Sequence, residues 1–77
     1  MANFEDVVKE LITTLEKDGH PDARAGAALG LGHCGGPGAL SALRKAMTTD
    51  GTAAVRGAAA KAIGQLLSRA QAADLIG

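Results

Sequence analysis

A repeat of 32 residues is the feature of this sequence that most restricts its fold. Arg24 and Arg56 stand one repeat apart, and each opens a stretch rich in alanine and glycine. The segment 53–67, AAVRGAAAKAIGQLL, therefore has an earlier counterpart in residues 23–32, ARAGAALGLG. The same offset pairs Ala27 with Ala59, Ala28 with Ala60, Leu31 with Ile63 and Gly32 with Gly64. A fixed period of this size indicates stacked supersecondary units.

Each repeat is expected to be a helical hairpin. Apolar residues at three-four spacing predict first helices over about residues 3–17 and 39–48, and second helices over about 21–34 and 53–67. Unit one thus spans about 3–34 and unit two about 37–67 in one all-α domain. The predicted inward residues are Phe4, Val7, Val8, Leu11, Ile12, Leu15, Ala27, Ala28, Leu31, Cys34, Leu40, Leu43 and Met47.

The ends of these helices have recognisable signals. Asn3 is suited to cap the first helix, because its side chain can accept a hydrogen bond from a backbone N–H of the first turn. Asp18-Gly19 and Asp50-Gly51 end the two first helices, and Pro21 suits the first position of the next helix. The run 35–38, GGPG, predicts the loop that joins the two units.

The predicted core is thin, which favours further association. Most of the hydrophobic residues are alanine, and Phe4 is the one aromatic residue. Residues 68–77 form a tail without glycine or proline before the last residue, so the tail can extend the last helix or fold back as half a third unit. We favour extension, with a symmetric homodimer formed through Leu67, Ala70, Leu75 and Ile76.

The charge of the chain is balanced in sum and uneven along its length. The formal net charge is zero, which argues against a nucleic-acid or anionic-membrane partner. Residues 1–22 carry six acidic residues against two lysines, a balance of −4, so the remainder carries +4. The two parts could pair with each other or with a second copy, or could simply be solvated. With no leader-like or membrane-spanning segment, we expect a cytoplasmic protein.

No catalytic, metal or cofactor site is expected. His33 and Cys34 are adjacent in a helix and point about 100° apart, so the pair cannot easily chelate one ion, and His20 adds too few ligands for a closed zinc site. Cys34 aligns with Leu66, which indicates a buried thiol. The serines and threonines have no histidine partner at motif spacing. We therefore expect a protein that is not an enzyme.

The pattern resembles the short HEAT-like repeats named after phycocyanobilin lyase subunits. The residues that carry this resemblance in unit two are Asp50, Val55, Arg56, Ala58, Ala59, Ala62, Ile63 and Gly64. The weaker set in unit one is Asp18, Arg24, Ala27, Ala28 and Gly32, with Gly26 departing from the usual alanine. The resemblance implies an α-solenoid fragment of two stacked hairpins with a helical tail. It is weak evidence for function, because such repeats serve enzyme subunits, scaffolds and chaperone-like proteins.

The resemblance also implies a ladder, in which the arginine opening each second helix meets an aspartate at a hairpin turn. Asp18, Asp22 and Asp50 lie at or just before helix N-termini, and Arg24 and Arg56 can bind such carboxylates with a fork of donors. We expect Arg56 and Asp50 to be energetically coupled on this account. In the alternative, both arginines are surface residues.

A candidate interaction surface follows from the second helices, which line the concave side of HEAT-like stacks. Eight residues at helical spacing would form a smooth floor for another helix: Gly26, Leu29, Gly30, His33, Ala58, Lys61, Ala62 and Gln65. The alternative is that these small residues are filler. The expected function is protein–protein contact, with another protein and with itself. The rival is an accessory enzyme subunit, for example a bilin lyase-like protein that handles a tetrapyrrole.

Overall fold

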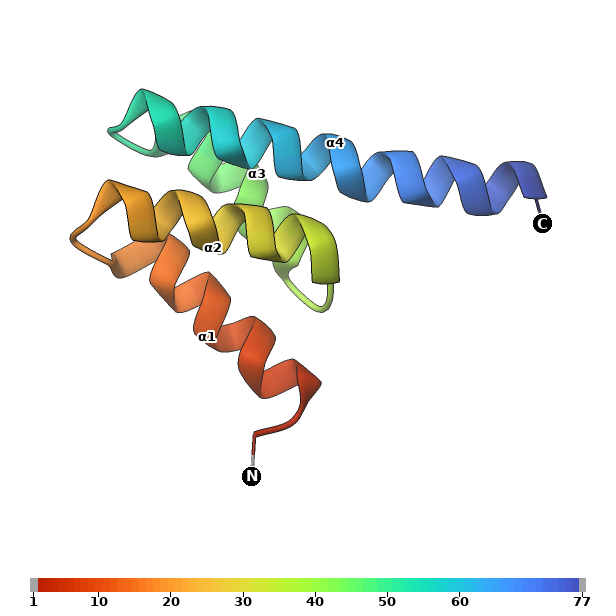
Figure 1. Cartoon of the computed structure of the whole chain (residues 1–77), viewed down its shortest axis with the longest axis horizontal. Coiled ribbons are helices and arrows are strands. Elements are labelled where there is room, and N and C mark those ends of the chain that lie inside the picture. Colours follow the sequence, from red (N-terminus) through yellow and green to blue (C-terminus); the bar gives the residue numbers. More distant parts are fainter. Residues whose placement is uncertain (1, 77) are drawn as a thin grey trace.

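Two helical hairpins stack side by side in this protein (Figure 1). The computed structural model describes the backbone of residues 2–76 and the side chains of residues 2–71. Unit one consists of α1 (Phe4–Lys17) and α2 (Pro21–Cys34), and unit two of α3 (Ala39–Thr49) and α4 (Ala53–Ile76). The all-α fold of stacked hairpins expected from the 32-residue repeat is confirmed.

The helix ends follow the local signals of the sequence. The side chain of Asn3 accepts a hydrogen bond from the Asp6 N–H at 2.9 Å, and the Asp6 carboxylate accepts one from the Asn3 N–H at 3.4 Å. This reciprocal arrangement is a capping box. Pro21 begins α2, as its missing N–H allows. Between the units, Gly36 and Gly38 adopt φ values of 102° and 79°, which side-chain-bearing residues rarely adopt.

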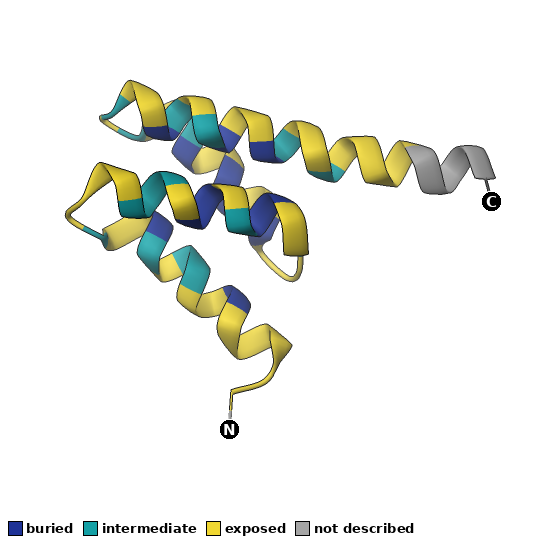
Figure 2. Ribbon diagram, in the orientation of Figure 1, coloured by how far each residue is buried: buried dark blue, intermediate teal, exposed yellow. Residues whose placement is uncertain are grey.

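The closest packing in the fold is between the second helices. α2 and α4 run side by side along most of α2, while α1 covers α2 and α3 covers α4. Figure 2 shows the buried positions gathered where these helices face one another. Seven of the twelve buried hydrophobic residues are alanine, so the helix backbones approach closely. The large core residues are Val8, Leu15, Leu31, Leu43 and Val55.

Parts of the predicted core are wrong. Phe4, Val7 and Leu40 are exposed, and Phe4 leaves 57% of its surface accessible. These residues lie in the first turn of α1 or α3. Leu11, Ile12 and Met47 are half-buried against the core. Only a narrow stripe of each first helix is therefore fully enclosed.

Cys34 is exposed, which corrects the prediction of a buried thiol. Its counterpart Leu66 is half-buried because it packs toward the preceding unit, where a Cβ atom added to Gly35 would lie 3.4 Å from a Leu66 methyl group. No described segment packs on Cys34 in the same way, and its thiol lies 3.5 Å from the Gly35 carbonyl oxygen. The 32-residue alignment identified equivalent positions correctly but assumed equivalent neighbours, and no described unit packs on unit one in the way that unit one packs on unit two.

α4 continues through the tail as one uninterrupted helix to Ile76. It is 24 residues long and extends past the end of α2 (Figure 1). Arg69 supports the start of this extension, because its Nη2 donates to the Gly32 carbonyl oxygen at 2.8 Å, near the C-terminus of α2. Leu67 and Ala70 are exposed, whereas the side chains of Leu75 and Ile76 lie outside the described residues. No described helix is both long and apolar enough to cross a membrane.

Two glycines one repeat apart have opposite environments. A Cβ atom added to Gly32 of α2 would lie 2.7 Å from the Ala62 Cβ and 2.8 Å from its Cα, so the two backbones are in direct contact. A Cβ atom added to Gly64 of α4 would meet no atom within 4 Å. Glycine is therefore required by close packing at the first position and not at the second.

We expect Gly32→Ala and Gly64→Ala to change stability in opposite directions. Gly32→Ala forces α2 and α4 apart and should cost about 1–3 kcal/mol of unfolding free energy. Gly64→Ala should add about 0.5–1 kcal/mol, because alanine loses less conformational entropy in a helix. Urea unfolding followed by circular dichroism measures both. Equal effects of the two substitutions would contradict the close contact of α2 with α4.

Candidate functional site

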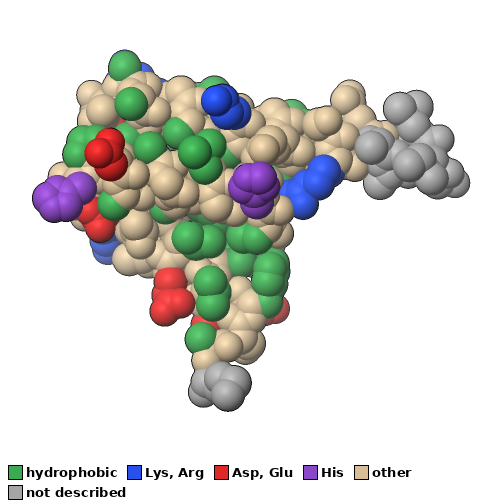
Figure 3. All heavy atoms as spheres, viewed as in Figure 1, with side chains coloured by type: hydrophobic (Ala, Val, Ile, Leu, Met, Phe, Trp, Pro, Cys, Tyr) green, Lys and Arg blue, Asp and Glu red, His purple; other side chains and the backbone are tan. Residues whose placement is uncertain are grey.

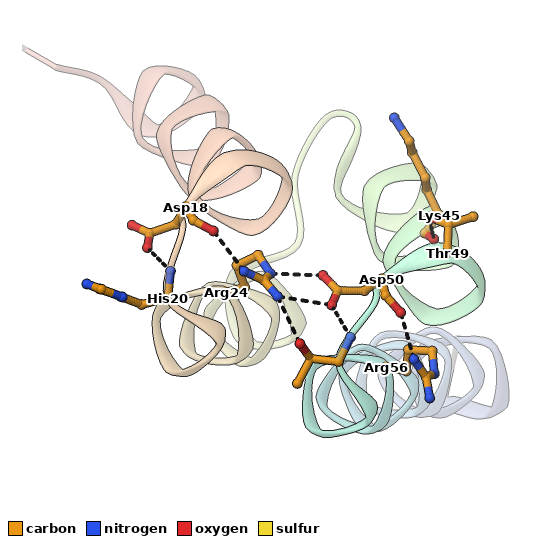
Figure 4. A network of polar contacts seen from close by, with 8 residues as sticks. Asp18, His20, Arg24, Lys45, Thr49, Asp50 and Arg56 are labelled. Atoms are coloured by element: carbon orange, nitrogen blue, oxygen red, sulfur yellow. Dashed lines mark hydrogen bonds and ion pairs between the residues drawn. The ribbon is translucent and has the colours of Figure 1, made fainter.

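The strongest polar contact in the structure joins the two units. Arg24 of α2 donates through Nε to Asp50 Oδ2 at 3.0 Å and through Nη2 to Asp50 Oδ1 at 3.3 Å (Figure 4). Nη2 also donates to the Thr52 hydroxyl at 3.1 Å. The side chains of Arg24 and Asp50 are only 16% and 10% exposed. Two parallel bonds with little solvent access make this pair strong and geometrically specific.

The hairpin turn of unit two holds the Asp50 carboxylate in place. Asp50 is the C-cap of α3 with extended backbone, and its Oδ1 accepts the Thr52 N–H at 2.9 Å. The hydrogen bonds from Arg24 lower the pKa of Asp50 below its ordinary value, against the opposing effect of burial. The Thr52 N–H and the charges of Arg24 and Arg56 lower it further. Asp50 is therefore a stable anion at neutral pH.

The partners of the ladder differ from the expected pairing of Arg56 with Asp50. Arg56 donates through Nη1 to the backbone carbonyl oxygen of Asp50 at 2.7 Å, and not to its carboxylate. Arg24 makes the same kind of bond to the Asp18 carbonyl oxygen at 2.9 Å. Each arginine thus fastens the turn of its own unit, and the remaining nitrogens of Arg24 reach the carboxylate of the next unit. The sequence-based pairing was one unit out of register.

The remaining predicted ladder residues lie at the periphery. The Asp18 carboxylate accepts the His20 N–H at 2.8 Å, and Asp22 is exposed in the first turn of α2. Among the described residues, neither Asp18 nor Arg56 has an ion-pair partner. A second contact between units, from Lys45 Nζ to Glu16 Oε2, is long at 3.9 Å and solvent-exposed. Exposed pairs of this kind contribute little.

The predicted eight-residue interaction surface is divided between two environments. Gly26, Leu29 and His33 are exposed on α2, with Gly30 half-buried beside Leu11. On α4, however, Ala62 is fully buried and Ala58 half-buried, while Lys61 and Gln65 are exposed. Ala62 and the Gln65 side chain face Gly32 of α2. Part of the α4 half of the predicted surface therefore packs against α2 inside the protein. The two helices contribute non-equivalent faces to this contact, so the equivalent residues of α2 stay outside it.

Two contacts were missed by the sequence analysis. Thr52 could have been found, because it follows Asp50 by two residues immediately before an alanine run, where a hydroxyl or carboxamide commonly caps a helix. The contact of Arg69 with Gly32 has no such signal. Its position corresponds to Pro37 in the other unit, so the repeat predicts no partner for it.

The surface hollows beside these contacts are modest. One of about 290 Å³ lies next to the ladder, between the C-terminal ends of α1 and α3. Another of about 400 Å³ lies between the end of α2 and the middle of α4, beside Gly32 and Arg69. No group of three His, Cys, Asp or Glu residues within residues 2–71 is arranged to hold a metal ion.

We expect strong energetic coupling between Arg24 and Asp50 and weak coupling between Arg56 and Asp50. Arg24→Ala should cost about 2–3 kcal/mol, because it leaves a largely buried carboxylate without its partner. A double-mutant cycle with Asp50→Ala should give a coupling of about 1–2 kcal/mol. The Arg56–Asp50 cycle should stay below about 0.5 kcal/mol, since alanine retains the carbonyl that Arg56 binds. Denaturant unfolding measures both couplings. Equal coupling energies in the two cycles would contradict the pairing of Asp50 with Arg24 and not with Arg56.

The lowered pKa of Asp50 predicts a specific acid dependence of stability. A carboxyl group with a lowered pKa in the folded state stabilises fully above its unfolded pKa of about 3.9, and the contribution is lost as pH falls through the folded value. We expect the difference in unfolding free energy between the wild type and Asp50→Asn to be constant from about pH 5 to 7 and to shrink below about pH 4. Urea unfolding at each pH measures it. A difference that grows on acidification would refute the assignment.

Comparison with known proteins agrees with this architecture. The family of HEAT repeats matches residues 8–77, which include both hairpins and the ladder. No curated protein matches the chain, and no solved structure does. The match gives no support for the narrower phycocyanobilin lyase type. Since the family match covers nearly the whole sequence, the chain belongs to the HEAT-repeat family.

Proposed function

We propose that this HEAT-repeat chain acts by binding other proteins through the faces of its second helices, without catalysis of its own. The surface concerned, called here the α2 face, consists of Gly26, Leu29, Gly30 and His33. Gly26, Leu29 and His33 are exposed, and Gly30 is half-buried beside Leu11 of α1. Figure 3 views the molecule from the side on which α2 and α4 lie in front.

One observation carries the proposal. The residues one repeat after Gly26, Gly30 and His33 are Ala58, Ala62 and Gln65, and the last two pack against α2 inside the protein. On α4, the residues equivalent to the α2 face therefore already pack closely against another helix. Leu29, exposed at 38%, adds an apolar contact that the α4 counterpart, Lys61, does not provide. A helical partner fits this face best.

The finer assignment to the phycocyanobilin lyase type is part of the proposal and rests on the Val55-Arg56 pattern of unit two. The rival function, an accessory subunit that handles a tetrapyrrole, gains no support from the described surface. Its hollows reach about 400 Å³ and are open, whereas ligand pockets enclose most of the ligand and are rich in aromatic residues. The absorbance spectrum of freshly purified protein would reveal a bound tetrapyrrole directly.

Self-association belongs to the same proposal. Leu67 and Ala70 are exposed where α4 passes beyond α2, and with Leu75 and Ile76 they would form the symmetric dimer expected from the sequence. The ladder offers a different surface for a second copy, and of the two contacts we favour the one through the ladder.

We expect Gly26→Leu to abolish capture of a partner protein while leaving the fold intact. A Cβ at Gly26 meets no atom within 4 Å, and leucine favours the helix, so the substitution blocks the α2 face without straining it. Affinity capture from the native source, with identification by mass spectrometry, would compare it with wild type and with Ala54→Leu. Ala54 is exposed on α4 and is not one of the α2-face residues, and its variant should behave as wild type. Proteins captured equally by all three would contradict the proposal.

A further inference from the structure

The ladder leaves a charged group without a described ion-pair partner at each end of the stack. Arg24 of unit one binds the carboxylate of Asp50 in unit two. One repeat later, Arg56 stands in the position of Arg24 and forms no ion pair with a carboxylate of the described residues. One repeat earlier, Asp18 stands in the position of Asp50, and its carboxylate forms no ion pair with an arginine of the described residues. The two ends of one molecule are thus complementary to each other.

Both end groups are already held in the geometry of the internal pair. Asp18 has φ −65° and ψ 138°, and Asp50 has φ −64° and ψ 138°. Each carboxylate accepts the N–H two residues on, at 2.8 Å for Asp18 and 2.9 Å for Asp50. Arg56 and Arg24 each donate through Nη1 to the carbonyl oxygen of the aspartate in their own turn. Little reorganisation is needed for Arg56 to bind a carboxylate placed like that of Asp50.

A matching helix face lies beside Arg56. On α2, Ala28 and Gly32 are buried against unit two. Their counterparts on α4, Ala60 and Gly64, are exposed. We call the α4 face the four residues Arg56, Gly57, Ala60 and Gly64. It repeats the surface that α2 presents to α4, and both of its glycines have open space where a side chain would be.

The charge distribution favours contact between opposite ends. Residues 1–22, which carry Asp18, have a formal balance of −4, and the rest of the chain, which carries Arg56, has +4. Complementary charge accelerates encounter and disfavours contacts between like ends. A symmetric contact of two α4 faces would instead bring two Arg56 side chains together.

We propose that a second copy of this chain docks its unit one on the α4 face, with its Asp18 bound to Arg56 and its α2 face against Ala60 and Gly64. The proposal deepens the proposed function and rests on it, since it names a partner for the α2 face. The contact is heterologous and does not close on itself, so copies add head to tail. Gly30 takes the place of Ala62 and His20 that of Thr52, so the contact is looser than the internal one.

Sedimentation equilibrium of the purified full chain tests the proposal. We expect the weight-average mass to rise with concentration between about 10 µM and 1 mM, past twice the 7.6 kDa of one chain, as for a weak open association. The rise should weaken in 0.5 M salt, because the pair is partly solvent-exposed before contact. A monomer throughout this range, or a mass that levels off at the dimer, would overturn the proposal.

Charge-reversal variants distinguish association through Asp18 and Arg56 from association through any other surface. Arg56→Glu and Asp18→Arg each place like charges at the contact, so each variant alone should remain monomeric. An equimolar mixture should associate again, because Glu at position 56 of one variant meets Arg at position 18 of the other. Circular dichroism melts check that both variants fold. Failure of the mixture to associate, with both variants folded, would overturn the assignment of Asp18 and Arg56.

Gly64→Leu provides a test that leaves the charges unchanged. It fills open space in the monomer but obstructs the α4 face, so association should be lost, whereas Ala54→Leu should associate as wild type. Association that survives Gly64→Leu but is lost in Leu75→Glu would assign the contact to the tail and overturn the proposal. A wild-type chain that stays monomeric, yet captures another protein in a Gly26-dependent manner, would refute this inference alone and leave the proposed function standing.

Discussion

The two hairpins of this protein stack through one bidentate ion pair and one close contact of helix backbones. Arg24 and Asp50 join the units at the hairpin turns, and Gly32 against Ala62 joins them along α2 and α4. Neither would suffice alone. The ion pair fixes direction and register but loses much of its Coulomb energy to desolvation, whereas the small-residue contact buries surface with little directional preference.

The same two contacts explain why so small a core specifies one arrangement. Most of the buried residues are alanine, so each buried side chain removes little apolar surface from water. Alanine also loses no side-chain rotamer entropy on folding, so the cost of ordering each buried side chain is small as well. Close approach of the backbones then depends on a few positions, of which Gly32 is the most demanding.

The secondary structure and the pairing of helices into hairpins could be predicted from the sequence, because the spacing of apolar residues and the signals at helix ends are local properties. The four helices, the Asn3 cap, the Pro21 start and the glycine loop all follow from short-range rules and were predicted. The predictions that were wrong concern which residues from other helices lie next to a given position. Cys34 was placed inside from its alignment with Leu66, and Arg56 was paired with the carboxylate that Arg24 binds. A repeat identifies equivalent positions, but which neighbour each position meets depends on its place in the stack. Ala62 shows the same limit, since it is fully buried against α2, whereas its counterpart Gly30 is half-buried beside Leu11 of α1.

The difference between the two arginines is the most direct test of this account. Each fastens its own turn through Nη1, but only Arg24 also donates through Nε, to the Asp50 carboxylate. Nuclear magnetic resonance of a dilute sample at neutral pH can follow the exchange of each Nε–H with water. The account predicts a slowly exchanging Nε–H for Arg24 and a rapidly exchanging one for Arg56. Equal exchange at the two arginines, or protection at Arg56 alone, would contradict it.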